Sequence, residues 1–400
     1  MKPVATPEQV LPHYPFSDRG DRLAPELSDL QRRCPVAKVR TNAGGEAWLV
    51  TGYDLARHVL RERRFGRQVL AEEGSPVQDA PILAPELMGA MDYLHRAGLR
   101  DEVLKALGRH QPDLPSGWVA HVTRAGLDAM TGNGDPGDLH RYFAEWVASH
   151  CMHRLLGLPI KDHHWLAPRA DLDLTMKTPT NEELARNWDE LRDYMLAHIR
   201  TRLDRPRGLL DRIAVLNDRH RVLDDVELAN IAALLYVSGY EDFASFLGVA
   251  VVKLLEQPTV MDTLRHRPDM TAHCVEELLR CSVVLGNAIQ RYVTEDGPLG
   301  DVFVRQGDLI MVSLDAVNFD PAAFAEPEVF DPARSPNPHL RFGYGRHHCP
   351  GGHLVRRQSA VAIQVLVHHL PRLRLAVPVA DIAWAPNRMA IIPERVPVYW

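Results

Sequence analysis

The chain has 400 residues, of which 46% are hydrophobic and 24% charged, so it can bury a large core and is not a disordered polypeptide. Its 52 acidic side chains outnumber the 46 basic ones, and the net charge of -6 disfavours a general nucleic-acid or anionic-membrane binder. Residues 1–22 lack the apolar stretch of a signal peptide or membrane anchor, and the five cysteines are scattered without a paired framework. We therefore expect a cytoplasmic protein.

The first predicted elements are a hairpin and a helix. Residues 36–40 and 47–51 are strand-like and flank the turn residues 42–45, which predicts a β-hairpin. Further along, a capping box begins at Thr180, and apolar residues follow it at helical spacing as far as Ile199. This pattern predicts a helix with one buried face.

A longer and more apolar helix is predicted in the middle of the chain. A second capping box, formed by Asp224 and Glu227, precedes residues 228–255, and the run ends near Pro258. These residues are apolar on most faces of a helix. A helix without a polar face is buried, so we expect this one to cross the core.

The C-terminal third contains strand signals, a coil and one more helix. Residues 302–305 and 309–313 predict a second hairpin, and residues 390–399 predict a further strand interrupted by prolines. Residues 318–337 contain four prolines among apolar side chains and are interpreted as packed coil, not as a linker. A helix is predicted from Cys349–Pro350 to His369. We predict one mainly α domain over residues 1–400, helix-rich with small peripheral β-sheets.

The loop at residues 342–351, Phe-Gly-Tyr-Gly-Arg-His-His-Cys-Pro-Gly, carries the clearest chemical signal. Its two internal glycines permit a tight turn, which delivers Cys349 to the N-terminus of the predicted helix. There the helix dipole and the free N–H groups favour a thiolate. The loop predicts a metal or nucleophile site, and the alternative for an isolated loop cysteine is a buried inert thiol.

This loop resembles the haem-binding loop of the cytochrome P450 superfamily, and two further motifs of that family occur in the same order. Residues 277–280 match its Glu-x-x-Arg motif, and residues 330–334 match the loop whose arginine completes a Glu–Arg–Arg cluster. The resemblance implies a single cytochrome P450 fold, haem b with Cys349 as the iron ligand, and dioxygen. It implies that Glu277, Arg280 and Arg334 form a buried structural cluster. The cofactor-binding residues that it implies are Arg96, Arg100, Arg291, Phe342, His347, Cys349 and Gly351.

The haem propionates need cations, and the resemblance assigns Arg100, Arg291 and His347 to them. The family usually has the pattern His-x-x-x-Arg in the helix that contains Arg100, whereas this chain has Arg96 at the histidine position and His95 one residue earlier. Either Arg96 replaces the histidine or His95 takes part. A surface arginine is the alternative for Arg96.

Residues 238–242, Ser-Gly-Tyr-Glu-Asp, match the family's proton-relay segment with one departure. Ser238, Gly239 and the acid Glu241 follow the pattern, but Asp242 stands where the family has an alcohol. A buried carboxyl with a raised pKa also relays protons, so we assign these residues to catalysis. The alternative is a polar helix kink lined by water. The departure disfavours ordinary hydroxylation and favours hydrogen abstraction followed by radical coupling.

Further matches extend over almost the whole chain and resemble a bacterial branch of the family that oxidises cyclodipeptides, the 2,5-diketopiperazines. They occur at residues 15–22, 46–50, 97–100, 318–321 and 392–400. Some members of this branch join the two phenol rings of cyclo(Tyr-Tyr), and others dimerise tryptophan-containing diketopiperazines. The resemblance therefore implies a small cyclic dipeptide as substrate.

Two departures bear on which dipeptide is used. Ala390 occupies the position of a basic residue in the tyrosine-coupling members, and Asp242 aligns with a serine there. A smaller wall with acidic groups favours an indole, whose buried N–H needs an acceptor; Glu241, Asp242 and Gln68 are candidate acceptors. Core packing explains the candidate pocket residues equally well; these are Gln68, Met88, Met91, Tyr93, Tyr240, Val284, Asn287, Ala288, Met389 and Ala390.

We therefore expect a haem-thiolate oxidase that couples tryptophan-containing cyclodipeptides. Conventional hydroxylation of a natural-product intermediate, phenol coupling of cyclo(Tyr-Tyr), and a haem-binding recruitment domain without turnover are the alternatives. The resemblance implies a separate ferredoxin and ferredoxin reductase as electron donors, and neither a nucleic acid nor a membrane as partner. Basic residues around the cysteine loop are expected to dock an acidic ferredoxin, or else to form a solvated surface; they are Arg341, Arg346, His348, His353, Arg356 and Arg357.

Overall fold

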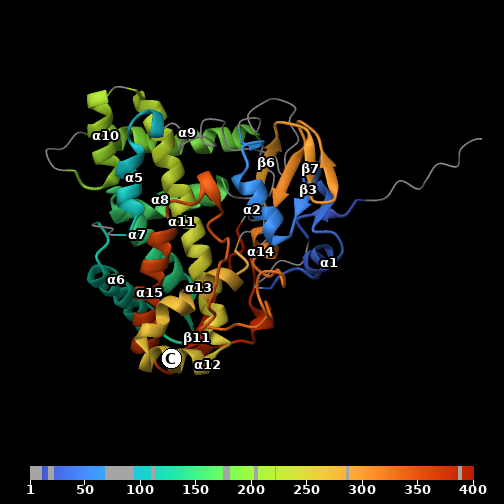
Figure 1. Ribbon diagram of the computed structural model, residues 1–400. Coiled ribbons are helices and arrows are strands. Elements are labelled where there is room, and N and C mark those ends of the chain that lie inside the picture. Colours follow the sequence, from blue (N-terminus) through green and yellow to red (C-terminus); the bar gives the residue numbers. More distant parts are fainter. Residues whose placement is uncertain are drawn as a thin grey trace, which may run out of the picture.

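The computed structural model describes residues 11–16, 22–67, 94–109, 113–173, 181–201, 206–220, 222–284, 288–385 and 390–400. Helices form the larger part of the molecule, and the strands of the main sheet gather on one side of it, at the right of Figure 1. This is the helix-rich fold with small sheets that the sequence predicts.

The helices vary widely in length. The longer ones are α6 (Ser116–Gly132), α9 (Asn181–Arg200), α10 (Leu209–His220), α11 (Asp225–Leu255) and α15 (Gly352–His369). The shorter ones are α1 (Pro25–Arg33), α2 (Tyr53–Arg61), α5 (Arg100–Leu107), α7 (Trp146–Leu156), α8 (His163–Asp173), α12 (Pro258–His266), α13 (Thr271–Cys281) and α14 (Leu314–Val317). A π-helical segment, His140–Glu145, leads into α7, and 3-10 turns cover Ile160–Asp162, Pro268–Met270, Gly345–His347 and Val379–Asp381.

Helix α11 is the central helix of the body and confirms the prediction for residues 228–255. Its capping box is present, because the Asp224 side chain accepts the Glu227 N–H and the Glu227 side chain accepts the Asp224 N–H, both at 2.8 Å. Helices α7 and α9 pack against it. Within the described residues, α11 alone is long and apolar enough to cross a bilayer, and 78% of its apolar window is buried in the protein, as a core helix requires.

The other two predicted helices are also present. Helix α9 follows the predicted periodicity, while α15 begins at Gly352, later than the predicted start at Cys349–Pro350. The physical reason is that the Cys349 N–H donates to the Phe342 carbonyl oxygen at 2.8 Å, so Cys349 still belongs to the loop. Helix α15 then packs against α6 and α13.

The main sheet has six strands in the order β1-β2-β3-β9-β6-β4. The strands are β1 (His13–Tyr14), β2 (Val36–Thr41), β3 (Glu46–Val50), β4 (Phe65–Gly66), β6 (Ile289–Val293) and β9 (Leu309–Val312). Strands β2 and β3 pair in antiparallel fashion with Val36 opposite Val50, which confirms the first predicted hairpin.

The second predicted hairpin is wrong. Strand β8 (Val302–Val304) pairs with β7 (Gly297–Leu299), whereas β9 lies between β3 and β6 in the main sheet. All four residues of β9 are buried, and a strand that is buried on both faces belongs in the interior of a sheet. The apolar run therefore marked a central strand and not the arm of a hairpin.

Of the remaining predictions for the C-terminal third, the packed coil is confirmed, and the strand predicted over residues 390–399 is present only at Pro397–Tyr399. In the coil at 318–337, the Asn318 side chain accepts the Leu340 N–H and the Asp320 side chain accepts the Tyr53 N–H, both at 2.7 Å, so the segment is packed. The last strand, β11 (Pro397–Tyr399), pairs with β10 (Arg374–Leu375) and β5 (Gly137–Asp138). Its proline stands at the first position, where a strand tolerates the missing N–H.

Candidate functional site

The cysteine loop reverses direction through two glycines with left-handed backbone. Gly343 has a φ of 72° and Gly345 a φ of 73°, a region that other residues adopt only with strain. A side chain at Gly345 would also clash, because its Cβ would lie 2.9 Å from the Leu60 carbonyl oxygen. The loop therefore needs glycine at this position, and the turn delivers Cys349 to the N-terminus of α15.

The sulfur of Cys349 faces a cavity and receives backbone N–H groups. Burial raises the pKa of the Cys349 thiol to about 11, and the N–H groups of Gly351 and Gly352, which point at the sulfur, oppose that rise. A coordinated metal ion deprotonates a thiol outright. A bound iron would therefore give the thiolate, the form that the N–H groups also favour. Among the cysteines of the described chain, only Cys349 lines the cavity.

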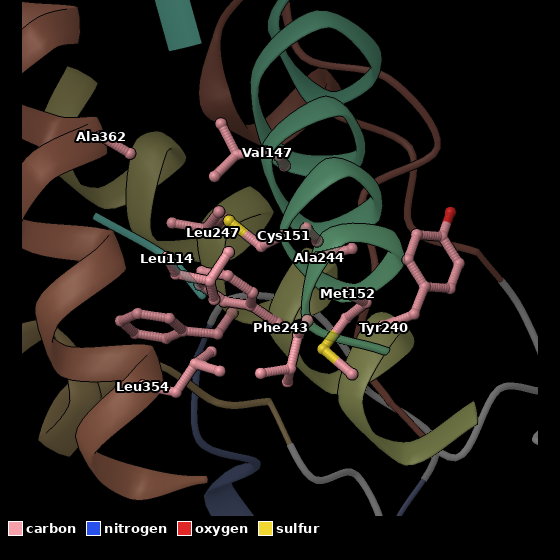
Figure 2. Close-up of a cluster of buried hydrophobic side chains, with 14 of the residues drawn as sticks. Leu114, Val147, Cys151, Met152, Tyr240, Phe243, Ala244, Leu247, Leu354 and Ala362 are labelled. Carbon is pink, nitrogen blue, oxygen red and sulfur yellow. The ribbon is translucent and has the colours of Figure 1, made fainter. Parts of the chain in front are cut away.

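The cavity has a volume of about 380 Å³ and lies between α11 and the cysteine loop. Its walls are mostly apolar; they include Leu107, Met152, Leu155, Leu235, Phe243, Phe246, Val284, Ile289, Phe342 and Leu354. In Figure 2, Met152, Phe243 and Leu354 belong to one cluster of buried side chains, with Leu354 on α15 and Met152 on α7. Such walls suit a flat apolar ring system.

Basic side chains gather at one end of this cavity. Arg291 is 2% exposed, and its Nη1 donates to the Gln290 carbonyl oxygen at 2.7 Å. Its Nε has no hydrogen-bond partner among the described residues. Burial, together with Arg67 and Arg346, lowers the pKa of Arg291 to about 9. A buried guanidinium beside other cations is a site for an anion, and His347 lines the same cavity.

Arg67 is a cavity residue that sequence reasoning missed. It lines the cavity together with Arg291 because strand β4 pairs with β6, with Gly66 opposite Tyr292. A local sequence pattern does not predict β4, because this strand has only two residues and pairs with residues more than 200 positions away. Arg96 precedes α5 and Arg100 is its first residue. Neither is among the residues that line the cavity, and their assignment to the propionates stays a prediction.

These residues fit a haem. The cavity offers a thiol on one wall, apolar side chains on both faces, and the partly unsatisfied guanidinium of Arg291 where carboxylates would lie. Cys349 would hold the iron, Arg291, Arg67 and His347 would face the propionates, and Phe342 and Gly351 would lie on the same side as the thiol.

The opposite wall is formed by α11, which presents Ser238, Gly239 and Asp242 to the cavity. Burial raises the pKa of Asp242 to about 6, against the opposing charge of Arg341. The Asp242 carboxylate in turn contributes to the raised pKa of Cys349, so the two groups interact across the cavity. Glu241 is 1% exposed and does not line the cavity, because it lies about 100° around the helix from Asp242.

The predicted Glu–Arg–Arg cluster is present and buried. Arg280 donates to both oxygens of Glu277 at 2.8 and 2.7 Å, and Arg334 Nε lies 3.1 Å from each of them. The side chains of Glu277 and Arg280 have no exposed surface, and that of Arg334 is 10% exposed. One carboxylate and the two guanidinium groups that it bridges therefore fix α13 to the coil that precedes the cysteine loop.

Two sequence expectations need correction. Tyr240 does not line the cavity: it packs against Tyr236 and His163, with ring centroids 5.9 and 5.1 Å away, and Figure 2 shows it directed away from Phe243. Arg341 is not a docking residue. It is 7% exposed and donates to Asp315 at 2.6 Å and to the carbonyl oxygens of Leu279 and Ser282.

The other substrate candidates divide into three groups. Val284 lines the cavity, whereas Ala288 and Ala390 are buried and are not among the lining residues. The remaining candidates lie outside the described residues; these are Gln68, Met88, Met91, Tyr93, Asn287 and Met389.

Comparisons with known proteins agree with this geometry. The profile of the family described as Cytochrome P450 matches residues 152–378. Mycocyclosin synthase of Mycobacterium tuberculosis is 35% identical over 397 residues, which are 98% of this chain and 99% of the relative. Mycinamicin IV hydroxylase/epoxidase of Micromonospora griseorubida is 33% identical over 394 residues, which are 97% and 98% of the two chains.

Solved structures of similar proteins also agree with this geometry. The crystal structure of HinD with NMFT and NO superposes with a TM-score of 0.90 at 31% identity and covers 98% of this chain and 99% of that chain. The LnmA cytochrome P450 hydroxylase of Streptomyces atroolivaceus superposes with a TM-score of 0.85 at 30% identity, covering 98% and 100%. With the family profile, two full-length relatives and the thiol-lined cavity in agreement, the chain belongs to the cytochrome P450 family.

Proposed function

We propose that this cytochrome P450 oxidises a tryptophan-containing cyclodipeptide by hydrogen abstraction and radical C–C or C–N coupling. The observation that carries the proposal is Asp242, a carboxyl group on the wall opposite Cys349, at the position where the family has an alcohol. The resemblance to the cyclodipeptide-oxidising branch supports the substrate class, and so does full-length similarity to mycocyclosin synthase.

The cofactor in this proposal is haem b, bound through Cys349 and the basic end of the cavity. A thiolate-ligated haem supplies the activation of dioxygen. The chain supplies the surroundings: the cavity walls exclude water, and the N–H groups of Gly351 and Gly352 stabilise the thiolate. Arg291 and Arg67 orient the cofactor by binding its carboxylates.

Asp242 holds and moves protons in this proposal. Burial raises its pKa to about 6, so near neutral pH both its protonated and its ionised forms are populated. A group with a pKa near the working pH is an effective proton donor and acceptor. Its carboxylate is also an acceptor for the N–H of an indole that enters the cavity.

The electron donor in this proposal is an acidic ferredoxin served by a ferredoxin reductase. Arg346, His348 and His353 are exposed around the cysteine loop. Helix α2, which contributes Arg57 and Arg61, packs against the 3-10 turn of the same loop. This basic surface lies on the thiol side of the cavity and is complementary to an acidic partner.

The test is a screen of cyclodipeptides with a surrogate ferredoxin and reductase, read by mass spectrometry. We expect coupled dimers from cyclo(Trp-Pro)-type compounds and no product from cyclo(Leu-Pro), the matched compound without an aromatic ring. A mass gain of one oxygen atom without dimers would establish oxygen insertion, by hydroxylation or epoxidation, the two activities in the name of the mycinamicin relative. The absence of turnover with every aromatic cyclodipeptide would overturn the proposed substrate class.

A further inference from the structure

A second polar group lies directly behind Phe342, the ring beside Cys349 on the cavity wall. Its members are Glu276 on α13, Arg356 on α15 and His339 in the coil before the loop. Arg356 Nε donates to Glu276 Oε1 at 2.7 Å, and His339 Nε2 lies 3.1 Å from Glu276 Oε2. The Glu276 carboxylate thus joins three segments of the chain at one point.

Both partners of Glu276 contact the Phe342 ring. The Arg356 guanidinium lies 4.6 Å from the ring centroid, in cation–π geometry, and the His339 ring centroid is 6.2 Å away. A Cβ on Gly352 would lie 3.2 Å from the Phe342 ring and 3.1 Å from Arg356, so the packing on this side is tight. Phe342 is therefore held from behind by groups whose own positions depend on Glu276.

The protonation states within this group follow from its hydrogen bonds. His339 Nδ1 accepts the Arg341 N–H at 3.3 Å, so in the neutral ring the proton is on Nε2, which donates to Glu276. Burial alone would raise the pKa of Glu276, but the bonds from His339 and Arg356 outweigh burial and lower it to about 2. Glu276 is therefore a carboxylate at every working pH.

Arg356 lies close to the cysteine loop. A Cβ on Gly352 would lie 3.1 Å from Arg356 Nη1, and a Cβ on the preceding Gly351 would lie 3.6 Å from the sulfur of Cys349, so the positive charge is beside the ligand site. The Glu276 carboxylate, 2.7 Å from Arg356, balances that charge. Glu277, the next residue on α13, is bound by Arg280, Arg334 and Asn337 and belongs to the separate buried cluster.

We propose that Glu276 is a positioning residue for the haem-thiolate centre: through Arg356 and His339 it fixes Phe342 against the cysteine loop and sets the net charge behind Cys349. The inference rests on the haem site of the proposed function and is independent of the substrate. It predicts that the two partners of one ion pair act on the haem iron in opposite directions.

The test measures the one-electron reduction potential of the haem iron in the purified holoprotein. In Glu276→Gln the charge of Arg356 is left uncompensated and favours the reduced iron, so the reduction equilibrium should shift upward by about tenfold, or about 59 mV. Arg356→Met should shift it downward, and Glu276→Asp, which keeps the charge, should stay near the wild type. The double variant should lie between the two single variants.

Arg357→Met is the matched control. Arg357 is the next arginine on α15, but it bonds to Ser116 Oγ and the Arg109 carbonyl oxygen, away from Phe342. Shifts of the same sign in Glu276→Gln and Arg356→Met, or shifts no larger than that of Arg357→Met, would overturn the inference. A wild-type protein without a thiolate-type ferrous–CO spectrum would instead refute the haem site itself, so the two failures are distinguishable.

Discussion

The two walls of the cavity differ in the number and the pairing of their charged groups. On the side of Cys349, charged groups occur in paired sets: Glu277 with Arg280 and Arg334, and Arg341 with Asp315. On the side of α11, the lining residues are apolar except for Ser238 and Asp242. The Asp242 side chain opens to the cavity and its pKa is raised, whereas the pKa of Glu276, which lies behind Phe342 on the thiol side, is lowered.

In the proposed function, this difference separates the groups that hold the cofactor from the group that acts on the substrate. A buried network of ion pairs resists change, because removal of one partner leaves a buried charge without compensation. A carboxyl group with few polar neighbours and a pKa near 6 changes its protonation state readily. In the proposed function the thiol side therefore determines the reaction class, and the α11 side contains Asp242, the expected departure from the family pattern.

The strongest test of the thiol side is removal of its ligand. Cys349→Ser or Cys349→His should abolish the thiolate-type Soret band of the ferrous–CO complex, because no other cysteine of the described chain faces the cavity. Cys34→Ser, a change at an exposed cysteine outside the cavity, is the control and should retain the band. A thiolate-type band that persists in either Cys349 variant would refute the assignment.

The next largest effect is expected in the buried ion cluster. Glu277→Gln leaves Arg280 and Arg334 without their carboxylate, and loss of one partner of a buried pair costs about 3–5 kcal/mol of unfolding free energy. Denaturant unfolding measures the change. Glu46→Gln, which breaks the exposed pair with Lys38, should cost no more than about 1 kcal/mol. Equal losses in the two variants would show that the cluster is not what stabilises this wall.

The sequence predicts the thiol side well because its signals are local. Each signal depends on only a few consecutive residues: one is the turn at Gly343 and Gly345, and the other is the spacing of Glu277 and Arg280. Helix periodicity likewise places Ser238 and Asp242, four residues apart, on one face of α11.

What the sequence does not predict depends on distant pairing. Arg67 reaches the cavity only because β4 pairs with β6, and the second hairpin fails because β9 joins the main sheet. Arg341 looks like a surface cation beside the loop, but Asp315 on another segment pairs with it in the interior. A local pattern fixes neither the strand order nor the partner of a buried charge.

Changing Asp242 tests the α11 side. Asp242→Ala should slow product formation by about 100-fold, the lower range for loss of a positioned proton donor, and should divert electrons to hydrogen peroxide. Asp242→Thr restores the family's alcohol and should raise the share of hydroxylated product. Product analysis and peroxide assays measure both effects. Unchanged rates and product profiles in both variants would show that Asp242 has a structural role and no role in proton transfer.

The same residue predicts a pH dependence. Since the pKa of Asp242 is raised to about 6, its protonated form becomes scarcer as the pH rises from 6 to 8. The rate advantage of the wild type over Asp242→Thr should therefore decrease over this interval, because threonine does not titrate there. Steady-state rates at fixed electron supply measure the ratio. A constant ratio from pH 6 to 8 would exclude proton donation by Asp242.

The smallest predicted effect is a difference in substrate affinity, and it decides which ring system the α11 side accepts. The resemblance gives the tyrosine-coupling members a cation at the position of Ala390, and without that donor the phenol oxygen of cyclo(Tyr-Tyr) should lose a hydrogen bond, at a cost of about 1–3 kcal/mol. An indole instead finds the Asp242 carboxylate as an acceptor and buries its rings against apolar walls such as Phe243 and Val284. Cyclo(Trp-Pro) should therefore displace water from the iron and shift its spin state at a concentration about 5- to 150-fold lower than cyclo(Tyr-Tyr) does. Optical titration of the ferric holoprotein measures both affinities. If cyclo(Tyr-Tyr) binds more tightly to the wild type, the carboxylate of Asp242 does not select an indole, and phenol coupling becomes the function that this wall supports.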